Sequence, residues 1–296
     1  MKIVLFGSGG QVGWELQRAL SPLGELVALS HDSADYCGDF NNLEGLAATL
    51  AQLKPNVIVN AAAHTAVDKA EAEPELARGI NALAPGVLAQ QAKLLGAWLV
   101  HYSTDYVFDG SGSKPWQETD VPAPLSVYGK SKLEGEQLIR ASGCQHLTFR
   151  TSWVYAARGA NFAKTMLRLA QERERLTVID DQMGAPTGAD LLADVTALAL
   201  RQVLQRPQDG GLYHLAAGGE TSWNGYAKHV IAQAVRAQPA IKIIANEVLA
   251  VPSTAFVTAA ARPLNSRLDT KRLQTTFGLQ LPPWQRGVDR MLAEIL

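Results

Sequence analysis

The chain has 296 residues, of which 47% are hydrophobic and 19% charged, and its formal net charge is −1. This length suits one large domain, or one domain with a smaller one attached, and the near-neutral charge favours neither nucleic acid nor an anionic membrane surface as a partner. Cys37 and Cys144 lie far apart and in no Cys/His cluster, which argues against a disulfide framework or structural zinc and is typical of the cytoplasm. No apolar run approaches the ~18 residues of a membrane span, and the run 3–6 is too short for a signal peptide core.

Short β-type runs alternate with helical stretches along the first half of the chain. Strands are expected at 2–6, 25–30, 56–60, 98–103 and 146–150, and helices at about 11–21, 43–53, 77–95 and 127–142. Such alternation implies right-handed βαβ crossovers. It predicts an α/β fold with a doubly wound parallel sheet, the Rossmann architecture, over residues 1–150.

The rhythm is less regular after residue 150. Strands are expected at 176–180 and 211–215, and helices at 189–204 and 226–237. The stretch 252–283, which mixes Pro, Arg and Asn, predicts loops that close over a ligand. We therefore expect a smaller C-terminal α/β part that binds substrate over 151–296, with the option that segments within about 211–237 return to the first domain.

A glycine-rich turn follows the first expected strand. Gly7, Gly10 and Gly13 have the spacing Gly-x-x-Gly-x-x-Gly, and Gln11 and Val12 begin the helix that follows. Glycines let the backbone approach a pyrophosphate, and the helix N-terminus offers free N–H groups to it. An arbitrary glycine triplet is more often an ordinary tight turn, but the strand-turn-helix position predicts dinucleotide binding.

The ends of the later strands predict further cofactor contacts. The second strand ends in Ser30, where a carboxylate would select NAD, and Asp32 follows it. We therefore expect both NADPH and NADH to be accepted. The other expected contacts are Asp39 and Phe40, which would follow a further strand between Ser30 and Asp39, counted as the third, and Ala62, Ala63, His64 and Thr65, which follow the strand at 56–60, counted as the fourth.

Tyr128 and Lys132 are four residues apart in an expected helix, so both project from one face. An adjacent ammonium is expected to lower the pKa of a phenol, as carbonyl reduction requires. The alternatives are a chance spacing on a solvated helix and, for Thr104 at the end of the fifth strand, a hydroxyl that only satisfies the strand end. Asn81 either ties Lys132 to its helix through water or serves as a packing residue.

Five ordered motifs, at 7–13, 60–68, 103–110, 128–132 and 262–268, resemble the extended short-chain dehydrogenase/reductases over almost the whole chain. The resemblance is to members that act on dTDP-linked sugars. It implies the NAD(P)H-dependent reduction of the C4 ketone of dTDP-6-deoxy-L-lyxo-4-hexulose to dTDP-L-rhamnose. That reaction is the last step in making an activated sugar for bacterial cell-surface polysaccharide, including the lipopolysaccharide O-antigen.

The resemblance implies roles for individual residues. Tyr128 is the proton donor, Lys132 its partner, and Thr104 the second hydroxyl at the site. Tyr106 stands where related 4,6-dehydratases carry a glutamate base, so elimination of water is not expected. The expected substrate contacts are Thr104, Asp105, Tyr128, Trp153, Arg262 and Asn265, the last two meeting the diphosphate.

For Trp153 and Arg262 a purely structural role is a strong alternative, since a tryptophan is commonly a core residue and an Arg-Pro pair commonly forms a loop corner. The resemblance also implies a homodimer and magnesium. Glu15 and Asp190 are candidate ligands of the metal, although isolated surface carboxylates are usually only solvated.

Two rival functions stay open. One is a reductase or epimerase of another nucleotide-linked ketosugar, and the other is a cofactor-binding regulatory subunit without catalysis.

Overall fold

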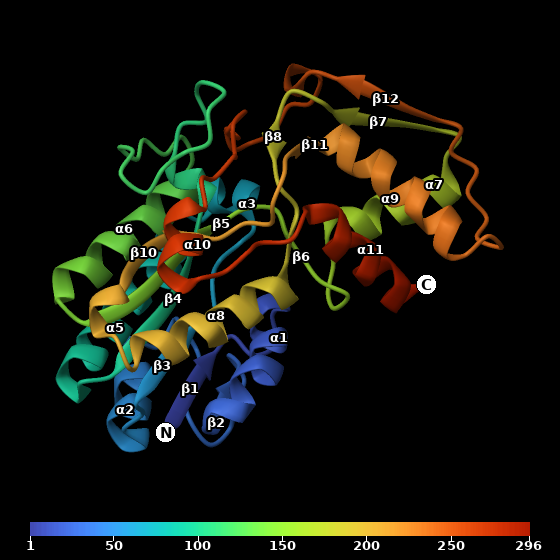
Figure 1. The fold of residues 1–296 in the computed structure, drawn as a ribbon. Helices are drawn as coiled ribbons and strands as arrows, with labels where there is room; N and C mark the ends of the chain where they lie inside the picture. The colour runs from blue at the N-terminus through green and yellow to red at the C-terminus, as the bar shows by residue number, and fades with distance from the viewer.

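A six-stranded parallel sheet forms the centre of the computed structural model, which describes residues 1–296 (Figure 1). The strand order is β2-β1-β3-β4-β5-β10. The bounds are β1 Lys2–Phe6, β2 Glu25–Leu29, β3 Val57–Asn60, β4 Trp98–Thr104, β5 Gln145–Thr151 and β10 Gly211–His214. Every neighbouring pair is parallel. The doubly wound Rossmann sheet predicted from the sequence is therefore confirmed.

Helices cover both faces of this sheet. The first face carries α1 Gln11–Leu20, α8 Ala189–Val203 and α10 Lys271–Phe277, and the second carries α2 Leu43–Leu53, α5 Ala84–Leu95 and α6 Val127–Ser142. All residues of β3 and β4 are buried, which explains why these strands are nearly continuous apolar runs in the sequence. Short 3-10 helices lie at η1 Ser21–Leu23, η3 Asp105–Val107, η4 Pro207–Asp209 and η5 Ser253–Ala255.

One expectation about the first half was wrong, and another was confirmed with an irregularity inside the helix. No strand forms between Leu29 and Asp39, because the polar segment 31–35 turns back on itself instead of pairing, and β2 is therefore the edge of the sheet. The helix expected at 77–95 is divided into α4 Pro74–Arg78, a π-helical turn η2 Gly79–Leu83 and α5. Pro85 has no N–H for the regular bond to Asn81, and the wider turn absorbs that loss. A further short helix, α3 Val67–Ala72, precedes α4.

The C-terminal part lies beyond the carboxyl ends of the sheet strands, at the upper right of Figure 1. Its largest strand pair is β7 Arg175–Ile179 with β12 Glu247–Val251, and its helices are α7 Phe162–Glu172, α9 Trp223–Ala237 and α11 Trp284–Ile295. Two minor pairs are β6 Val154–Tyr155 with β9 Thr187–Gly188, and β8 Met183–Gly184 with β11 Thr221–Ser222.

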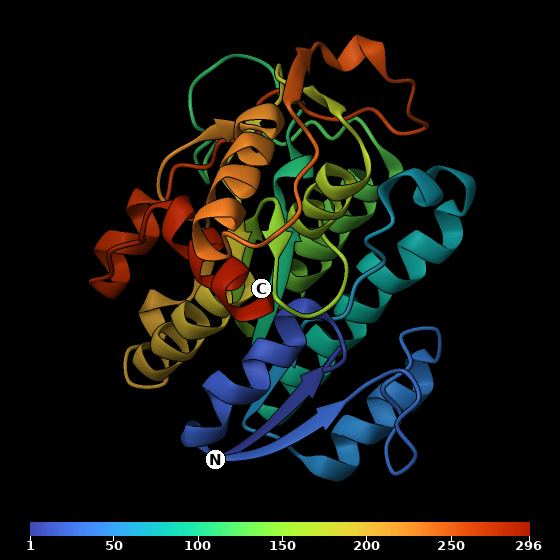
Figure 2. The same cartoon turned by 90° about the vertical axis from the view of Figure 1, so that its right-hand side faces the viewer.

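The chain crosses between the two parts more than once. The segment 211–214 returns to the sheet as β10, whereas α9, which follows it, packs on α7 and α11 (Figures 1 and 2). The stretch 252–283 was expected to consist of loops, but it contains the helix α10, which packs on the same face of the sheet as α1 and α8. None of the helices is both long and apolar enough to cross a membrane. The crossings leave the carboxyl edge of the sheet facing the C-terminal part.

Candidate active site

The glycine turn is built as a phosphate-binding turn requires. Gly7 has φ +81°, and a Cβ there would lie 2.6 Å from the backbone nitrogen of Ala62. A Cβ on Gly13 would lie 2.0 Å from the carbonyl oxygen of Gly7, so only glycine fits at either place. Gly10 precedes α1 without a side-chain cap, which leaves the first N–H groups of the helix free to bind an anion.

Ser30 lies where the sequence places a contact with the adenosine ribose, at the end of β2. Its hydroxyl donates to the Asp32 carboxylate at 2.6 Å, and this bond is the main reason that the pKa of Asp32 lies below its ordinary value. Phe40 is buried with its ring edge against Phe6. Asp39 accepts the backbone N–H of Asn41 at 2.9 Å. Phe40 is thus a core residue that can offer only its backbone to a cofactor.

Asn81 fixes the backbone beside the expected cofactor segment 62–65. Its side chain accepts the N–H of His64 at 2.8 Å and donates to the carbonyl of His64 at 3.0 Å. It also donates to the hydroxyl of Ser131 at 3.1 Å. Asn81 makes no direct hydrogen bond with Lys132; its hydrogen bonds join the segment at His64 to helix α6 at Ser131. Thr65 is exposed at the end of this segment.

The end of β4 and the start of α6 bring Thr104 and Tyr128 together. Thr104 is the last residue of β4 and is buried. Helix α6 begins beside it because the hydroxyl of Ser126 caps the N–H of Gly129 at 3.1 Å. Tyr128, in the first turn, packs edge-on against the ring of Tyr106 with centroids 5.5 Å apart. Tyr106 thus places a phenol at the position where dehydratases would need a carboxylate base.

Tyr128 is half-buried and lies beside Thr104. Burial raises its pKa to about 12, while a hydrogen bond with Thr104 works against that rise. The Asp105 carboxyl adds to it. Tyr128 therefore carries its proton throughout the neutral range and is a proton donor held against a second hydroxyl.

Lys132 is buried one helical turn further along α6. Its Nζ donates to the carbonyl oxygen of Tyr102 at 2.5 Å and lies 3.4 Å from Nε2 of His101. Burial lowers the pKa of Lys132 to about 8, against an opposing effect of Glu136. The expected lowering of the Tyr128 pKa by this ammonium is absent, because the amine turns toward Tyr102 and burial of the phenol dominates.

Asp105 follows Thr104 and is buried, with its Oδ2 lacking any hydrogen-bond partner. Burial raises the pKa of this carboxyl to about 6, and hydrogen bonds from Ser266 and Thr104 oppose the rise. The Thr104 hydroxyl lies 3.1 Å from Oδ1. Asp105 therefore reaches the pair of hydroxyls through its hydrogen bond with Thr104.

A cavity of about 600 Å³ opens next to Tyr106 between the two parts of the chain. Its walls are mainly apolar and include Arg262 and Trp223. Trp153 stacks on Trp223 with ring centroids 3.7 Å apart, and it has a φ of +50°, a strained value for a bulky residue. Trp153 does not line this cavity itself; it stacks on Trp223, which does.

Sequence reasoning missed most of the cavity lining. The missed residues include Phe162, Met166, Val178, Gln182, Trp223 and Phe256. They come from α7, β7, the segment just before β8, α9 and the loop after β12, and no local motif marks any of them. Only the unassigned aromatic residues at the starts of α7 and α9 were a usable signal.

Arg262 and Asn265 differ in what they can offer to a diphosphate. Arg262 binds Asp68 at 2.6 Å through Nη2, while its Nη1 has no partner. Asn265 is buried, and its amide donates to the carbonyls of Lys114 at 2.8 Å and Ser111 at 3.3 Å. The amide thereby holds two loops together and its oxygen accepts from Arg267, so every group of the side chain has a protein partner, and the ligand contact of Asn265 stays a prediction. Arg262 keeps donors for an anion.

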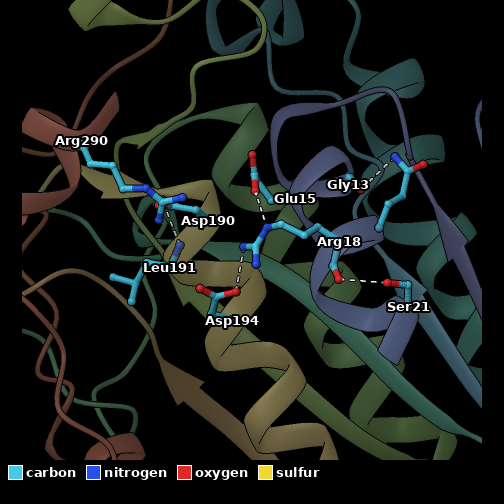
Figure 3. Close-up of polar contacts among 9 residues, drawn as sticks. Gly13, Glu15, Arg18, Ser21, Asp190, Leu191, Asp194 and Arg290 are labelled. Atoms are coloured by element: carbon cyan, nitrogen blue, oxygen red, sulfur yellow. Dashed lines mark hydrogen bonds and ion pairs between the residues drawn. The ribbon is translucent and has the colours of Figure 1, made fainter. Parts of the chain in front are cut away.

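The two candidate metal ligands lie in a separate hollow of about 330 Å³ between α1, α8 and α11. Arg18 contacts Glu15 at 3.3 Å and also binds Asp194 at 2.8 Å (Figure 3). Arg290 contacts Asp190 at 3.0 Å. No group of three acidic, histidine or cysteine side chains gathers here or elsewhere. Because an arginine already neutralises each carboxylate, the residues of one protomer do not fit a magnesium ion.

Comparison with known proteins places this geometry in a family. The family model described as the RmlD substrate binding domain matches residues 1–296. A dTDP-4-dehydrorhamnose reductase of Escherichia coli strain K12 is 59% identical over 295 residues, covering 100% of this chain and 98% of that protein. One of Burkholderia thailandensis is 45% identical over 300 residues, covering 100% and 99%.

Solved structures agree. The dTDP-4-dehydrorhamnose reductase of Bacillus anthracis in complex with NADP matches with a TM-score of 0.87 at 34% identity over 99% of each chain. The UDP-glucose 4-epimerase of Thermus thermophilus, in complex with NAD, has a TM-score of 0.76 at 17% identity over 100% of both chains and shares the fold. The resemblance of the five motifs is confirmed: this chain belongs to the dTDP-4-dehydrorhamnose reductase family and is a nicotinamide-dependent oxidoreductase.

Proposed function

We propose that this chain reduces the C4 ketone of dTDP-6-deoxy-L-lyxo-4-hexulose to dTDP-L-rhamnose, using NADPH or NADH. The observation that carries the proposal is the placement of Tyr128, in the first turn of α6, beside Thr104, the last residue of β4, at the carboxyl edge of the sheet. The glycine turn lies at the same edge, and the cavity with Arg262 opens beside Tyr106. The nicotinamide cofactor and the nucleotide-sugar would therefore both bind next to Tyr128, the proposed proton donor.

The chemistry divides between the cofactor and the chain. A bound nicotinamide cofactor supplies a hydride to C4, which leaves negative charge on the ketone oxygen. Tyr128 gives that oxygen its proton, and Thr104 holds the oxygen with a hydrogen bond that strengthens as the charge develops. Lys132 holds the nicotinamide ribose and exchanges protons with Tyr128. The stated roles of these three residues are part of the proposal.

The nucleotide-sugar is held by the cavity walls in this proposal. The apolar and aromatic walls suit the base and sugar faces, and the unpartnered Nη1 of Arg262 suits a phosphate oxygen. Dehydration is not proposed, because Tyr106 lacks the carboxylate that water elimination needs and Asp105 is buried behind Thr104.

We also propose that this chain acts as a homodimer in the cytoplasm. Magnesium has no role in the reaction as proposed, since Glu15 and Asp190 line a hollow that Tyr128 does not line, and each is paired with an arginine (Figure 3). Light scattering in the presence and absence of EDTA measures both the oligomeric state and its dependence on metal.

A panel of substrates tests the function. NADPH oxidation is followed with dTDP-, GDP- and UDP-linked 4-ketosugars, and the dTDP-linked 4-hexulose is expected to be turned over with the highest kcat/KM. NADH should support the same reaction within about a hundredfold in kcat/KM. A preference for another ketosugar would replace the assignment. Cofactor binding without turnover of any ketosugar would favour the regulatory subunit.

A further inference from the structure

A buried polar chain runs from β3 through β4 to Lys132. Asn60 on β3 and His101 on β4 are paired in the sheet register, and both are only 1% exposed. Asn60 Nδ2 lies 3.0 Å from Nδ1 of His101, and His101 Nε2 lies 3.4 Å from Nζ of Lys132. Two fully buried polar side chains that lead to a buried lysine are costly to assemble unless each has a partner.

The hydrogen bonds determine which nitrogen of His101 carries the proton. The amide oxygen of Asn60 accepts the backbone N–H of Ala62 at 3.0 Å, so the other end of the amide, directed at His101, is the NH₂ donor. Nδ1 of His101 must accept that hydrogen bond and has no proton of its own. In the neutral imidazole, the proton is then on Nε2, the atom that faces Lys132.

An N–H facing Lys132 distinguishes its two protonation states. A neutral amine has a lone pair that can accept this N–H, whereas an ammonium has only donors and would repel it. The imidazole cannot resolve the conflict by taking up a second proton, because burial and the charge of Lys132 keep the pKa of His101 well below its ordinary value.

The charged groups around Lys132 do not cancel this effect. Glu136 on the same helix favours the ammonium, but its carboxylate is held by Arg150 at 2.7 and 2.9 Å and by the hydroxyl of Ser103. The other titratable groups near these residues are His146 on β5, which acts on the pKa of His101, Asp105 directly after β4, and Tyr128 in the first turn of α6. Asp105 shares hydrogen bonds with Thr104 and Ser266 and forms no ion pair with Lys132. Neither carboxylate is therefore a direct partner that holds Lys132 in its charged form.

We propose that His101 is a positioning residue that sets the protonation equilibrium of Lys132: Asn60 fixes the imidazole as the Nε2–H tautomer, and this N–H favours the neutral amine. This inference rests on the proposed roles of Tyr128 and Lys132. Each reduction consumes the phenolic proton of Tyr128. A lysine that titrates near neutral pH can take up and release the replacement proton, which an ordinary lysine cannot.

The first test compares His101→Phe with Thr148→Val in pH profiles of kcat. The first variant keeps a ring but removes the N–H, so the alkaline midpoint should move upward by about one pH unit. Thr148 is the register partner of His101 on β5, is equally buried, and bonds His146 instead of Lys132. Its variant loses a buried hydrogen bond and should keep the wild-type midpoint. A folded His101→Phe protein with an unmoved midpoint would overturn the proposal.

The second test needs neither a variant nor turnover. Nitrogen-15 NMR of labelled histidine in the wild-type protein should show His101 as a neutral Nε2–H tautomer from about pH 6 to about pH 9. A proton on Nδ1, or an imidazolium in that range, would overturn the inference. Failure of the wild type to reduce any ketosugar would instead reject the proposed function, so the two failures are distinguishable.

Discussion

The buried carboxyl of Asp105 should make the protein less stable as the pH rises. Burial raises its pKa from 3.8 to about 6, so between these values the folded protein binds a proton that the unfolded chain has already lost. The shift of about 2.2 units, at about 1.4 kcal/mol each, corresponds to about 3 kcal/mol. Stability from this group is fully present below about pH 4 and is lost as the pH rises through about 6.

Asp105→Asn removes this dependence, because the amide stays neutral and still offers an oxygen to Thr104 and Ser266. The variant should gain about 1.6 kcal/mol over the wild type at about pH 5 and about 3 kcal/mol at about pH 7.5. Urea unfolding at both pH values measures the gain. Asp109→Asn is the matched control, because hydrogen bonds with Ser111 lower the pKa of that exposed carboxyl and its loss should not stabilise. An Asp105→Asn gain that does not grow with pH would refute the reasoning.

Two further substitutions test the packing around the site. Arg150→Met leaves the buried carboxylate of Glu136 unpaired and should cost about 3–5 kcal/mol in urea unfolding, much of it recovered by adding Glu136→Gln; a cost below about 1 kcal/mol would mean that the pair is solvated. Gly13→Ala places a Cβ 2.0 Å from the Gly7 carbonyl and should lower both Tm and NADPH affinity, whereas a Cβ on Gly9 meets nothing within 4 Å. Equal Tm values for Gly13→Ala and Gly9→Ala would contradict this account of the turn.

The parts of the site that could be predicted are those specified by neighbouring residues in the chain. The glycine turn needs only a strand, three glycines and a helix in sequence. The helix that carries Tyr128 and Lys132 has the bounds expected, 127–142, because Ser126 caps its start and Gly143 ends it in a left-handed conformation. Local patterns are therefore enough to locate the cofactor turn and the helix of the proposed proton donor.

The features that could not be predicted depend on contacts between distant segments. Asn265 has the residue type of a phosphate ligand, but its partners Ser111 and Lys114 are about 150 positions away in sequence. The pairing of Arg290 with Asp190 likewise joins α11 to α8 and removes a candidate metal ligand. Burial of the Tyr128 phenol reversed the expected direction of its pKa shift, since enclosure depends on every element around it.

The central claim is that Tyr128 protonates the ketone oxygen of a dTDP-linked 4-ketosugar. The most direct measurement is the kcat for NADPH oxidation with dTDP-6-deoxy-L-lyxo-4-hexulose by the wild type and by Tyr128→Phe, with NADPH affinity measured for both. Loss of the general acid should lower kcat by roughly 10²–10⁴-fold while NADPH still binds. A Tyr128→Phe enzyme that keeps near wild-type kcat would contradict the account.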